Sequence, residues 1–489
     1  MKEKKKLFAI CLCMLLIVSQ ALVTYGSTVP YKSYTYDYWE FVAPTPVPYI
    51  PLKSISGESL GVGKFVLPTD LVVDEDENIY VLDAGSNRIV VFDKNFKLVR
   101  EITEFDNEGK TDTFNNPNGL CISDRGTLYV ADTDNHRIVE MTAEGKLNRI
   151  YTAPNDATLG SDFVFLPMKV TVDSADRVYV VAKNVFQGLI SFDDTGKFLG
   201  YFGTIKVQVS PIDWFWRLVA TKAQRAKMAL FIPTEFTNVD IDDEGFIYAT
   251  NVDYNDQETI KRLNPSGKNV LINYTNRKIK GDLEYMIKKG PYSGPSTFCD
   301  VKYRDKGIYS ALDNTKGKIF TYDSEGHLLY VFGGMGTALG TFKKPVALEC
   351  KNDNIYVLDE ARGEIVVFKP TEYGRCINTA VSLRFDGDET AAVGYWERVL
   401  KLDANYELAY VGIGKSYLAA NRNKEAMVYL KKGMDKKYYS VAFKRYRNEV
   451  LKANLGNIMT GLCILLLIIF GVKAYKKYIL KGKGKKVDA

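Results

Sequence analysis

The stretch that decides the fold runs from residue 117 to residue 138 and reads PNGLCISDRGTLYVADTDNHRI. A proline leads a short apolar run, a turn of Ser, Asp, Arg and Gly follows, and a second run carries Tyr129. Turn-forming residues between short runs rich in Val, Ile and Tyr are typical of antiparallel hairpins. The stretch therefore predicts two paired strands, with a third strand beginning after His136.

The same unit recurs six times along the chain. Each copy has a tyrosine in its second strand: Tyr80, Tyr129, Tyr179, Tyr248, Tyr309 and Tyr356. Each copy also has a leading proline: Pro68, Pro117, Pro167, Pro233, Pro295 and Pro345. A sheet of three or four strands cannot bury both faces alone, whereas sheets stacked radially leave only short edges. The repeat therefore predicts a mainly β fold, a six-bladed β-propeller over residues 51–370.

A propeller ring must also close. The stretch from Pro51 to Gly57 is similar to the outer strands of other repeats and precedes the first complete unit. We expect Leu52–Ile55 to pair beside Glu364–Phe368 and to complete the last blade.

Two turns carry a family resemblance. Asn135-His136-Arg137-Ile138, and Ser86-Asn87-Arg88-Ile89 one blade earlier, resemble the NHL-repeat family of β-propellers. The resemblance covers residues of about 60–370 and departs from the pattern in blades 3 to 5, as at Val185-Phe186-Gln187-Gly188. It implies the fold specifically but not the function, because such propellers include scaffolds, RNA binders and lyases.

Beyond Arg375 the apolar period changes from two residues to about 3.6. Ala392 and Ala426 head matching predicted helices, and Gly414 and Tyr417 lie on a helix between them. This spacing is similar to tetratricopeptide repeats. Residues 371–454 are therefore expected to form a small all-α segment, in which the helix Val441–Ala453 caps about two repeats and continues toward a membrane span.

Both ends of the chain carry membrane signals. Four lysines precede an apolar run from Leu7 to Val23, which reads as a signal peptide or an uncleaved anchor over residues 1–27. A Pro- and Tyr-rich linker occupies residues 28–50. A second apolar segment, residues 455–475, has the length of a transmembrane helix, although a buried core helix is the alternative. Lys473 lies near its end and six lysines follow it, so residues 476–489 are predicted to form a cytoplasmic tail and the body to lie outside the cell.

Charge and cysteine usage narrow the possible partners. The formal charge of +6 conceals basic ends, +3 over residues 1–6 and +13 over residues 421–489. The remaining body therefore carries 6 − 3 − 13 = −10, which disfavours binding along a nucleic-acid backbone. Cys121, Cys299, Cys350 and Cys376 lie in the predicted external body, and we expect no disulfide-dense scaffold. We expect Cys121 and Cys299 to occupy equivalent repeat positions.

The propeller mouth is the place to look for a ligand site. The residues two positions after the leading prolines read Asp70, Gly119, Lys169, Glu235, Thr297 and Ala347. Asp70 and Glu235 would face each other across six blades, and with Asn118, Lys169 and Thr297 they are candidate ligand-binding residues. A divalent cation held by Asp70 and Glu235 is the possible cofactor, and no other cofactor is expected. The alternative is a set of hydrated side chains with no tight ligand.

Two further features, a pair of Asp–Arg combinations and a helical insertion, can each be interpreted as either structural or functional. Asp83 with Arg88, and Asp132 with Arg137, either form a binding surface or cap turns and tie blades together. An insertion over residues 204–231 holds a helical pattern from Ile212 to Leu230 with basic charges. Its membrane or partner surface would contain Trp214, Phe215, Trp216 and Arg217, unless the helix packs on the propeller.

The predicted function is a membrane-anchored, extracytoplasmic scaffold without a catalytic residue. Propeller and helical repeats would bind protein partners, or a glycan or small ligand, in a single-pass cell-membrane protein of bacterial envelope type. An accessory role beside a transport or envelope complex follows by analogy. The alternative is an axial-metal hydrolase or lyase of the lactonase-like propeller type, which resembles this chain in blade count. Nucleic acid is not expected as a partner.

Overall fold

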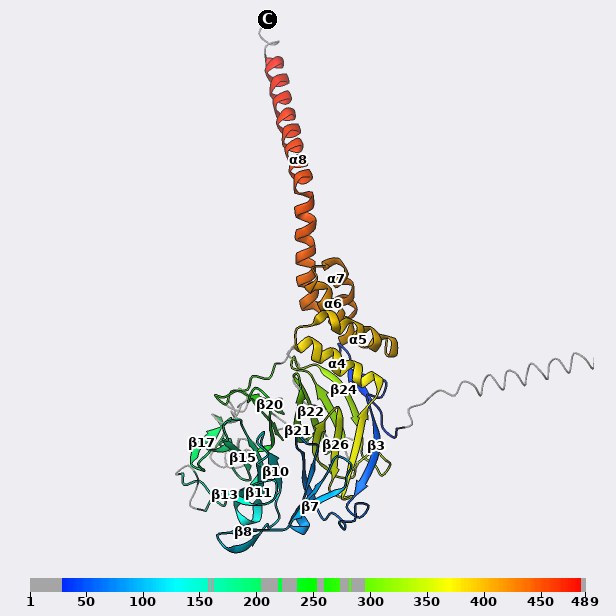
Figure 1. Ribbon diagram of the computed structural model, residues 1–489. Helices are drawn as coiled ribbons and strands as arrows, with labels where there is room; N and C mark the ends of the chain where they lie inside the picture. The colour runs from blue at the N-terminus through cyan, green and yellow to red at the C-terminus, as the bar shows by residue number, and fades with distance from the viewer. Residues whose placement is uncertain are drawn as a thin grey trace, which may run out of the picture. The chain divides into compact units, whose positions relative to one another are not determined.

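The computed structural model describes residues 29–156, 159, 162–203, 219–221, 235–252, 259–272, 281–282 and 295–484. The chain divides into two compact units, residues 1–386 and 387–489 (Figure 1). The first unit contains the sheets and the helix α4, and the second contains the helices α5 to α8.

Blades 1 to 3 are four-stranded antiparallel sheets in sequence order. Blade 1 holds β4 (Pro68–Val73), β5 (Ile79–Asp83), β6 (Arg88–Phe92) and β7 (Leu98–Ile102). Blade 2 holds β10 (Gly119–Ile122), β11 (Leu128–Asp132), β12 (Arg137–Met141) and β13 (Leu147–Tyr151). Blade 3 holds β14 (Pro167–Val172), β15 (Val178–Ala182), β16 (Leu189–Phe192) and β17 (Phe198–Phe202). A two-stranded hairpin, β8 (Glu104–Asn107) and β9 (Lys110–Thr113), lies between blades 1 and 2 in the chain.

Blades 4 and 5 depart from four strands. Blade 4 has three described strands, β18 (Phe236–Ile241), β19 (Ile247–Asn251) and β20 (Ile260–Leu263). Blade 5 holds β21 (Phe298–Asp305), β22 (Ile308–Asp313), β23 (Lys318–Tyr322) and β24 (Leu328–Gly333). The N-terminal strands β1 (Tyr34–Tyr36) and β2 (Val42–Pro44) pair beyond β24 and extend this sheet to six strands.

Blade 6 confirms the predicted closure. Its strands are β25 (Pro345–Lys351), β26 (Asn354–Asp359) and β27 (Glu364–Pro370), followed by β3 (Tyr49–Ser56) from the N-terminal part of the chain. Ile55 pairs with Ile365 and Lys53 pairs with Val367, as expected for the closing strand. The innermost strands contact one another in the ring β4, β10, β14, β18, β21, β25 and back to β4. The six-bladed propeller is therefore confirmed.

The hydrophobic core is divided among the interfaces between blades. Ile55 and Leu358 of blade 6 pack in one buried cluster with Val81 of blade 1, and Tyr80 and Leu128 share the cluster between blades 1 and 2. Further clusters join blades 2 and 3, blades 3 and 4, and blades 4 and 5. Each of these clusters combines residues of two neighbouring blades, so a blade buries its apolar surface largely against the blades beside it.

Blades 4 and 5 correct the predicted repeat alignment. In blade 1 Pro68 pairs with Asp83, but Phe236 pairs with Asn251 in blade 4 and Phe298 pairs with Asp313 in blade 5. Phe236 and Phe298 are therefore the residues equivalent to Pro68, and each lies three residues after the predicted leading proline, Pro233 or Pro295. A bulge follows each of these paired residues, which inserts one unpaired residue before the register resumes.

The helices continue the chain after blade 6. The first, α4 (Glu372–Phe385), begins at Thr371, whose side chain accepts a hydrogen bond from the Gly374 N–H. The second unit holds α5 (Glu389–Leu402), α6 (Glu407–Ala419), α7 (Asn423–Lys432) and α8 (Lys436–Gly484). Ala392 and Ala426 are fully buried on α5 and α7, and Gly414 and Tyr417 lie on α6, as expected.

The last helix confirms the expected continuation into an apolar segment. α8 is 49 residues long, and its part Lys436–Ile479 is long and apolar enough to cross a membrane. Its apolar side chains, such as Leu467 and Phe470, are exposed in the structure. By length and composition α8 is a candidate transmembrane helix.

Candidate functional site: the propeller axis

The inner strands place one ring of side chains around the axis. In blades 1, 3, 4, 5 and 6 the register resumes at the residue after a bulge, as where Asp70 pairs with Leu82 and Lys169 pairs with Val181. In blade 2 the equivalent residue is Gly119, the first residue of β10. The equivalent residues in the six blades, here called the upper ring, are Asp70, Gly119, Lys169, Asn238, Asp300 and Ala347. Four of the six residues predicted from the leading prolines, Asp70, Gly119, Lys169 and Ala347, therefore belong to this ring, and two of these four, Asp70 and Lys169, are candidate ligand-binding residues.

These two residues form an ion pair between blades 1 and 3. Lys169 Nζ lies 2.8 Å from Asp70 Oδ2, and it also donates to the backbone carbonyl of Thr69 at 3.3 Å. The same Asp70 oxygen accepts a hydrogen bond from the Leu120 N–H at 2.8 Å, and Oδ1 accepts from the Leu71 N–H. Both carboxylate oxygens of Asp70 are thus bound within the protein, so the pair joins three blades.

Asp300 repeats this arrangement between blades 5 and 6. Its Oδ2 accepts a hydrogen bond from the Leu348 N–H at 2.6 Å, and its Oδ1 accepts one from Asn238 Nδ2 of blade 4. Burial raises the pKa of Asp300 well above its ordinary value; the positive charge of Lys169 opposes this shift and the negative charge of Asp70 adds to it. The upper ring therefore holds two carboxyl groups but only one cation.

A lower ring follows two residues further along each inner strand. Its members are Val72, Cys121, Thr171, Asp240, Lys302 and Glu349. Lys302 Nζ lies 3.1 Å from Asp240 Oδ1 and 3.2 Å from Glu349 Oε2. Burial raises the pKa of Glu349 to about 7, against the lowering effect of Lys302. This ring also joins three successive blades through one lysine.

The carboxylate oxygens of the two rings are occupied by protein donors. Asp240 Oδ2 accepts the Tyr303 N–H and Glu349 Oε1 accepts the Cys350 N–H, in addition to their contacts with Lys302. A metal ion prefers carboxylate oxygens that are free to coordinate it. The arrangement instead joins inner strands of different blades through ion pairs and hydrogen bonds between buried polar groups.

The remaining candidate ligand-binding residues, Glu235, Asn118 and Thr297, lie outside the upper ring. Glu235 precedes β18, and its Oε1 accepts the Asn184 N–H at 2.8 Å, so Asn238 rather than Glu235 takes the position across from Asp70. Asn118 Nδ2 donates to the Asn116 carbonyl and to Thr133 Oγ1. The Thr297 N–H donates to Asp313 Oδ1 at 3.1 Å. A ligand or cation for these residues stays a prediction.

The residues that the sequence interpretation missed are Asn238, Asp300, Asp240, Lys302 and Glu349. A signal for the first of them exists in the chain. Counting ten residues back from Tyr80, Tyr129, Tyr179 and Tyr248 gives Asp70, Gly119, Lys169 and Asn238. In blades 5 and 6 the same count gives Cys299 and Val346, one residue before the ring, so the tyrosine locates the ring position in blades 1 to 4.

The Asp–Arg pairs of blades 1 and 2 have the structural role. Asp83 is fully buried; its Oδ2 lies 2.9 Å from Arg88 Nε and its Oδ1 accepts the Val66 N–H. Asp132 Oδ2 lies 2.8 Å from Arg137 Nε, and its Oδ1 accepts the Asn115 N–H. In both blades the aspartate therefore binds the loop that enters the blade and the arginine that begins the third strand.

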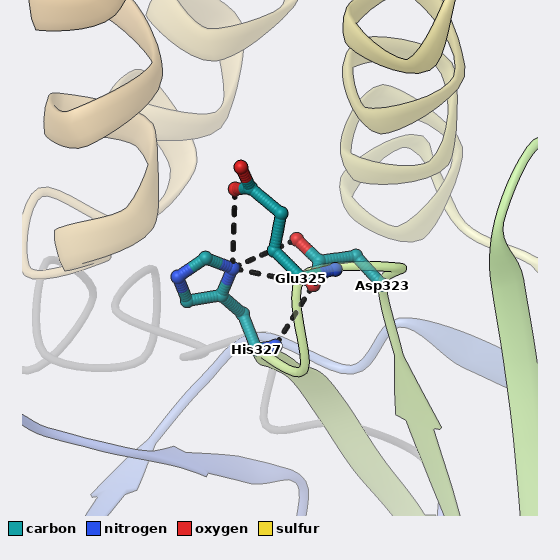
Figure 2. Close-up of side chains that lie close together, drawn as sticks. All are labelled: Asp323, Glu325 and His327. Atoms are coloured by element: carbon teal, nitrogen blue, oxygen red, sulfur yellow. Dashed lines mark hydrogen bonds and ion pairs between the residues drawn. The ribbon is translucent and has the colours of Figure 1, made fainter. Parts of the chain in front are cut away.

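A second group of ligand-type side chains occurs in the turn between β23 and β24. Figure 2 shows Asp323, Glu325 and His327, with His327 Nδ1 2.9 Å from Asp323 Oδ2 and 3.7 Å from Glu325 Oε2. Asp323 Oδ1 accepts the N–H groups of Glu325 and His327, which is the ordinary bonding of this turn. Arg384 Nη2 of α4 lies 3.0 Å from Glu325 Oε2. The nearby guanidinium disfavours a metal ion, so we assign the group to the turn.

Two further predictions concern the cysteines and the insertion over residues 204–231. Cys121, Cys299, Cys350, Cys376 and Cys463 are free thiols. Cys121 and Cys299 are not equivalent, since Cys121 belongs to the lower ring and Cys299 lies in the bulge before Asp300.

The insertion residues Trp214, Phe215, Trp216 and Arg217 lie outside the described residues, and their membrane or partner role stays a prediction.

Comparison with known proteins agrees with the repeat assignment. The NHL repeat matches residues 65–92 and 114–140, which lie in the first three strands of blades 1 and 2 and the loops that precede them. NHL repeat-containing protein 2 of Homo sapiens is 37% identical over 103 residues, 19% of this chain and 14% of that protein. The probable peptidyl-alpha-hydroxyglycine alpha-amidating lyase pgal-1 of Caenorhabditis elegans is 29% identical over 110 residues, 22% of this chain and 31% of that protein. The chain thus spans less than a third of the length of either relative.

Among solved structures, virginiamycin B lyase from Staphylococcus aureus has 11% sequence identity and a TM-score of 0.41. The alignment covers 66% of this chain and 99% of that chain. The chain is a six-bladed β-propeller with NHL repeats in its first two blades, followed by helices and one candidate transmembrane helix.

Proposed function

We propose that this protein is a membrane-anchored, extracytoplasmic scaffold that binds protein partners through its propeller and its helical unit. The anchor is α8, whose apolar part is exposed and is followed by lysines. Because positive residues favour the cytoplasmic side, the tail would lie inside the cell and the propeller outside.

The observation that carries the proposal is the state of the propeller axis. The carboxylates of Asp70, Asp300, Asp240 and Glu349 each bind a lysine, an amide or a backbone N–H of another strand. Side chains that hold the inner strands together are poorly placed to take part in hydrolysis or metal binding. A rigid ring whose axial polar groups are already hydrogen-bonded within the protein is suited to present its outer loops to a partner.

The helical unit supplies a second binding element. Helices α5, α6 and α7 pack in succession, with Trp396, Ala409 and Leu430 fully buried among them. Their similarity to tetratricopeptide repeats favours recognition of a protein segment. An accessory role beside a transport or envelope complex, and binding of a glycan or small ligand, are finer parts of the same proposal.

The second candidate is an axial-metal hydrolase or lyase. It is favoured by the match to the pgal-1 protein, whose name describes a lyase. In this chain, however, the two carboxylates predicted to hold the metal, Asp70 and Glu235, bind different partners. A metal would have to displace Lys169 from Asp70 or use residues outside those described.

Affinity purification of the full chain from detergent-solubilised membranes tests the proposal. We expect a stoichiometric protein partner that is retained by Gly394→Ala and lost in Gly412→Ala. A Cβ at position 412 would collide with the Trp396 indole, whereas one at position 394 meets no neighbouring atom. Metal analysis of the same preparation tests the second candidate: a stoichiometric metal ion with no protein partner would overturn the scaffold.

A further inference from the structure

The turn between β1 and β2 is a rigid element that displays aromatic side chains. Asp37 Oδ1 accepts the N–H groups of Trp39 and Phe41 at 2.8 and 2.9 Å. The Asp37 N–H donates to the Phe41 carbonyl, and the Glu40 N–H donates to the Asp37 carbonyl. Four hydrogen bonds within five residues hold the turn, so its exposed side chains are presented in a defined geometry.

The same hydrogen-bond pattern recurs in other turns of the propeller. The residues that take the place of Asp37 are Asp93, Asp173, Asp193, Asp242, Asn264 and Asp323. The residues that take the place of Trp39 are Asn95, Ala175, Thr195, Glu244, Ser266 and Glu325. The turn therefore does not require a tryptophan or any aromatic residue at this position.

The aromatic residues of the β1–β2 turn are also unusually exposed. Trp39 is 66% exposed and Phe41 is 70% exposed, and Val42 beside them is 58% exposed. The Tyr38 ring meets the Trp39 ring edge to face, with centroids 5.0 Å apart. By contrast, Phe246, which takes the place of Phe41 in the Asp242 turn, lies under the guanidinium of Arg262. Large apolar side chains gathered on a fixed turn indicate a surface that is covered in use.

We propose that the tip formed by Tyr38, Trp39 and Phe41 inserts into the lipid–water interface of the membrane that holds α8. Trp and Tyr are the residues that concentrate at this interface, because their rings are apolar and carry a polar edge. The proposal rests on the proposed anchor, which keeps the first unit tethered to a bilayer. An apolar run also ends at Val23, sixteen residues before Trp39.

The charges of the tip define the lipid surface that it fits. Asp37 and Glu40 are the residues of the turn that carry a charge at neutral pH, and both are acidic. An anionic headgroup layer would repel them, whereas a zwitterionic layer would not. The contact is therefore with the phosphatidylcholine or phosphatidylethanolamine type of surface, and it depends on the aromatic rings rather than on basic residues.

Fluorescence quenching of the full chain in nanodiscs tests the contact. The variant Trp214→Phe/Trp216→Phe retains Trp39 and the fully buried Trp396. We expect loss of Trp39 emission when the phosphatidylcholine carries brominated acyl chains. The same variant with Trp39→Phe gives the emission of Trp396 for subtraction. Trp39 emission that is quenched by aqueous acrylamide but not by brominated lipid would overturn the proposal.

A substitution that copies the residues of another turn tests whether the exposed aromatic side chains are needed for folding. Trp39→Asn/Phe41→Lys places the residues of the Asp93 turn, Asn95 and Lys97, in the β1–β2 turn. We expect a melting temperature within about 2 °C of the parent, as for surface substitutions. A large fall would show that the rings support the fold and would overturn the proposal.

Two further outcomes are distinguishable. If the chain fails to enter nanodiscs, the proposed anchor is wrong. If it enters nanodiscs but brominated lipid leaves Trp39 emission unchanged, the anchor stands and the tip contact fails. Loss of a protein partner in Trp39→Asn/Phe41→Lys, with Trp39 unquenched by lipid, would assign the tip to that protein instead.

Discussion

Blades 1 and 2 differ from blade 5 in how the end of the second strand is held. In blades 1 and 2 a buried aspartate binds the arginine opposite it, Asp83 with Arg88 and Asp132 with Arg137. In blade 5 the paired residues are Asp313 and Lys318, and Lys318 Nζ lies 2.7 Å from Asp282 Oδ2 and 2.8 Å from Tyr34 Oη.

The difference shows the effect of a lysine, Lys318, at the position where blades 1 and 2 have an arginine. Arginine has a planar fork that reaches the aspartate opposite it and further acceptors, whereas lysine offers one compact charge. In blade 5 that charge is directed to Asp282 and to the N-terminal strand, and Asp313 Oδ2 accepts no hydrogen bond among the described residues. Burial accordingly raises the pKa of Asp313. Blade 5 therefore depends on the N-terminal segment, while blades 1 and 2 are held internally.

Removing the aspartate of an internally held blade should have the largest effect. Asp132→Ala leaves the partly buried Arg137 without one carboxylate and the Asn115 N–H without its acceptor. We expect a loss of about 3 kcal/mol in the free energy of unfolding, measured by urea denaturation. Asp134→Ala, at an exposed position two residues on, is the matched control and should cost less than about 0.5 kcal/mol. Equal losses would contradict an internal role for Asp132.

Stability should depend on pH through Glu349 in blade 6, whose equivalent in blade 1 is Val72. Its pKa is about 7 in the folded protein and 4.5 when exposed. Between these values the folded state binds the proton that the unfolded state releases, so stability falls as pH rises from about 4.5 to 7. Glu349→Gln should remove on the order of 3 kcal/mol of this fall. Urea denaturation of both proteins at pH 5 and pH 8 measures the fall in the free energy of unfolding. An equal fall in the parent and in Glu349→Gln would contradict the prediction.

Breaking the N-terminal contact should weaken blade 5 selectively. Asp282 accepts hydrogen bonds from Tyr34, Tyr36 and Lys318, and Asp282→Asn removes the charge. We expect a loss of about 1–2 kcal/mol of local stability in β1 and β24, seen as faster amide hydrogen exchange. Exchange in β5 of blade 1 serves as the internal control. Equal acceleration in β5 would show that blade 5 does not depend on this contact separately.

Double-mutant cycles give the finest test of the comparison. Asp83→Ala with Arg88→Ala should show a coupling energy of about 1–3 kcal/mol, because the two side chains bind directly. Asp313→Ala with Lys318→Ala should show coupling below about 0.5 kcal/mol, because Lys318 binds Asp282 instead. Similar values in the two cycles would remove the distinction between the blades.

The ring and its closure could be predicted because they follow from patterns repeated along the chain. The recurring tyrosine defined six units, and the similarity of residues 51–57 to other outer strands identified β3. The axis was only partly predicted. Asp70 and Lys169 lie two residues after a strand-leading proline, but Asn238 and Asp300 do not, since the equivalent position falls three residues later in blades 4 and 5. Side chains such as Lys302 meet their partners only through the fold, and no local spacing shows this.

The pairing of β3 with β27 has a consequence for how the chain acquires its structure. Ile55 and Ile365 are 365 − 55 = 310 residues apart in sequence, yet they lie opposite each other in one sheet. Contacts of such high sequence separation slow folding, because the intervening chain must be brought together before they form. The ring cannot become complete until almost all of its strands have been synthesised. During synthesis the ring therefore stays open at this position until late, and β3 stays unpaired until β27 has been made.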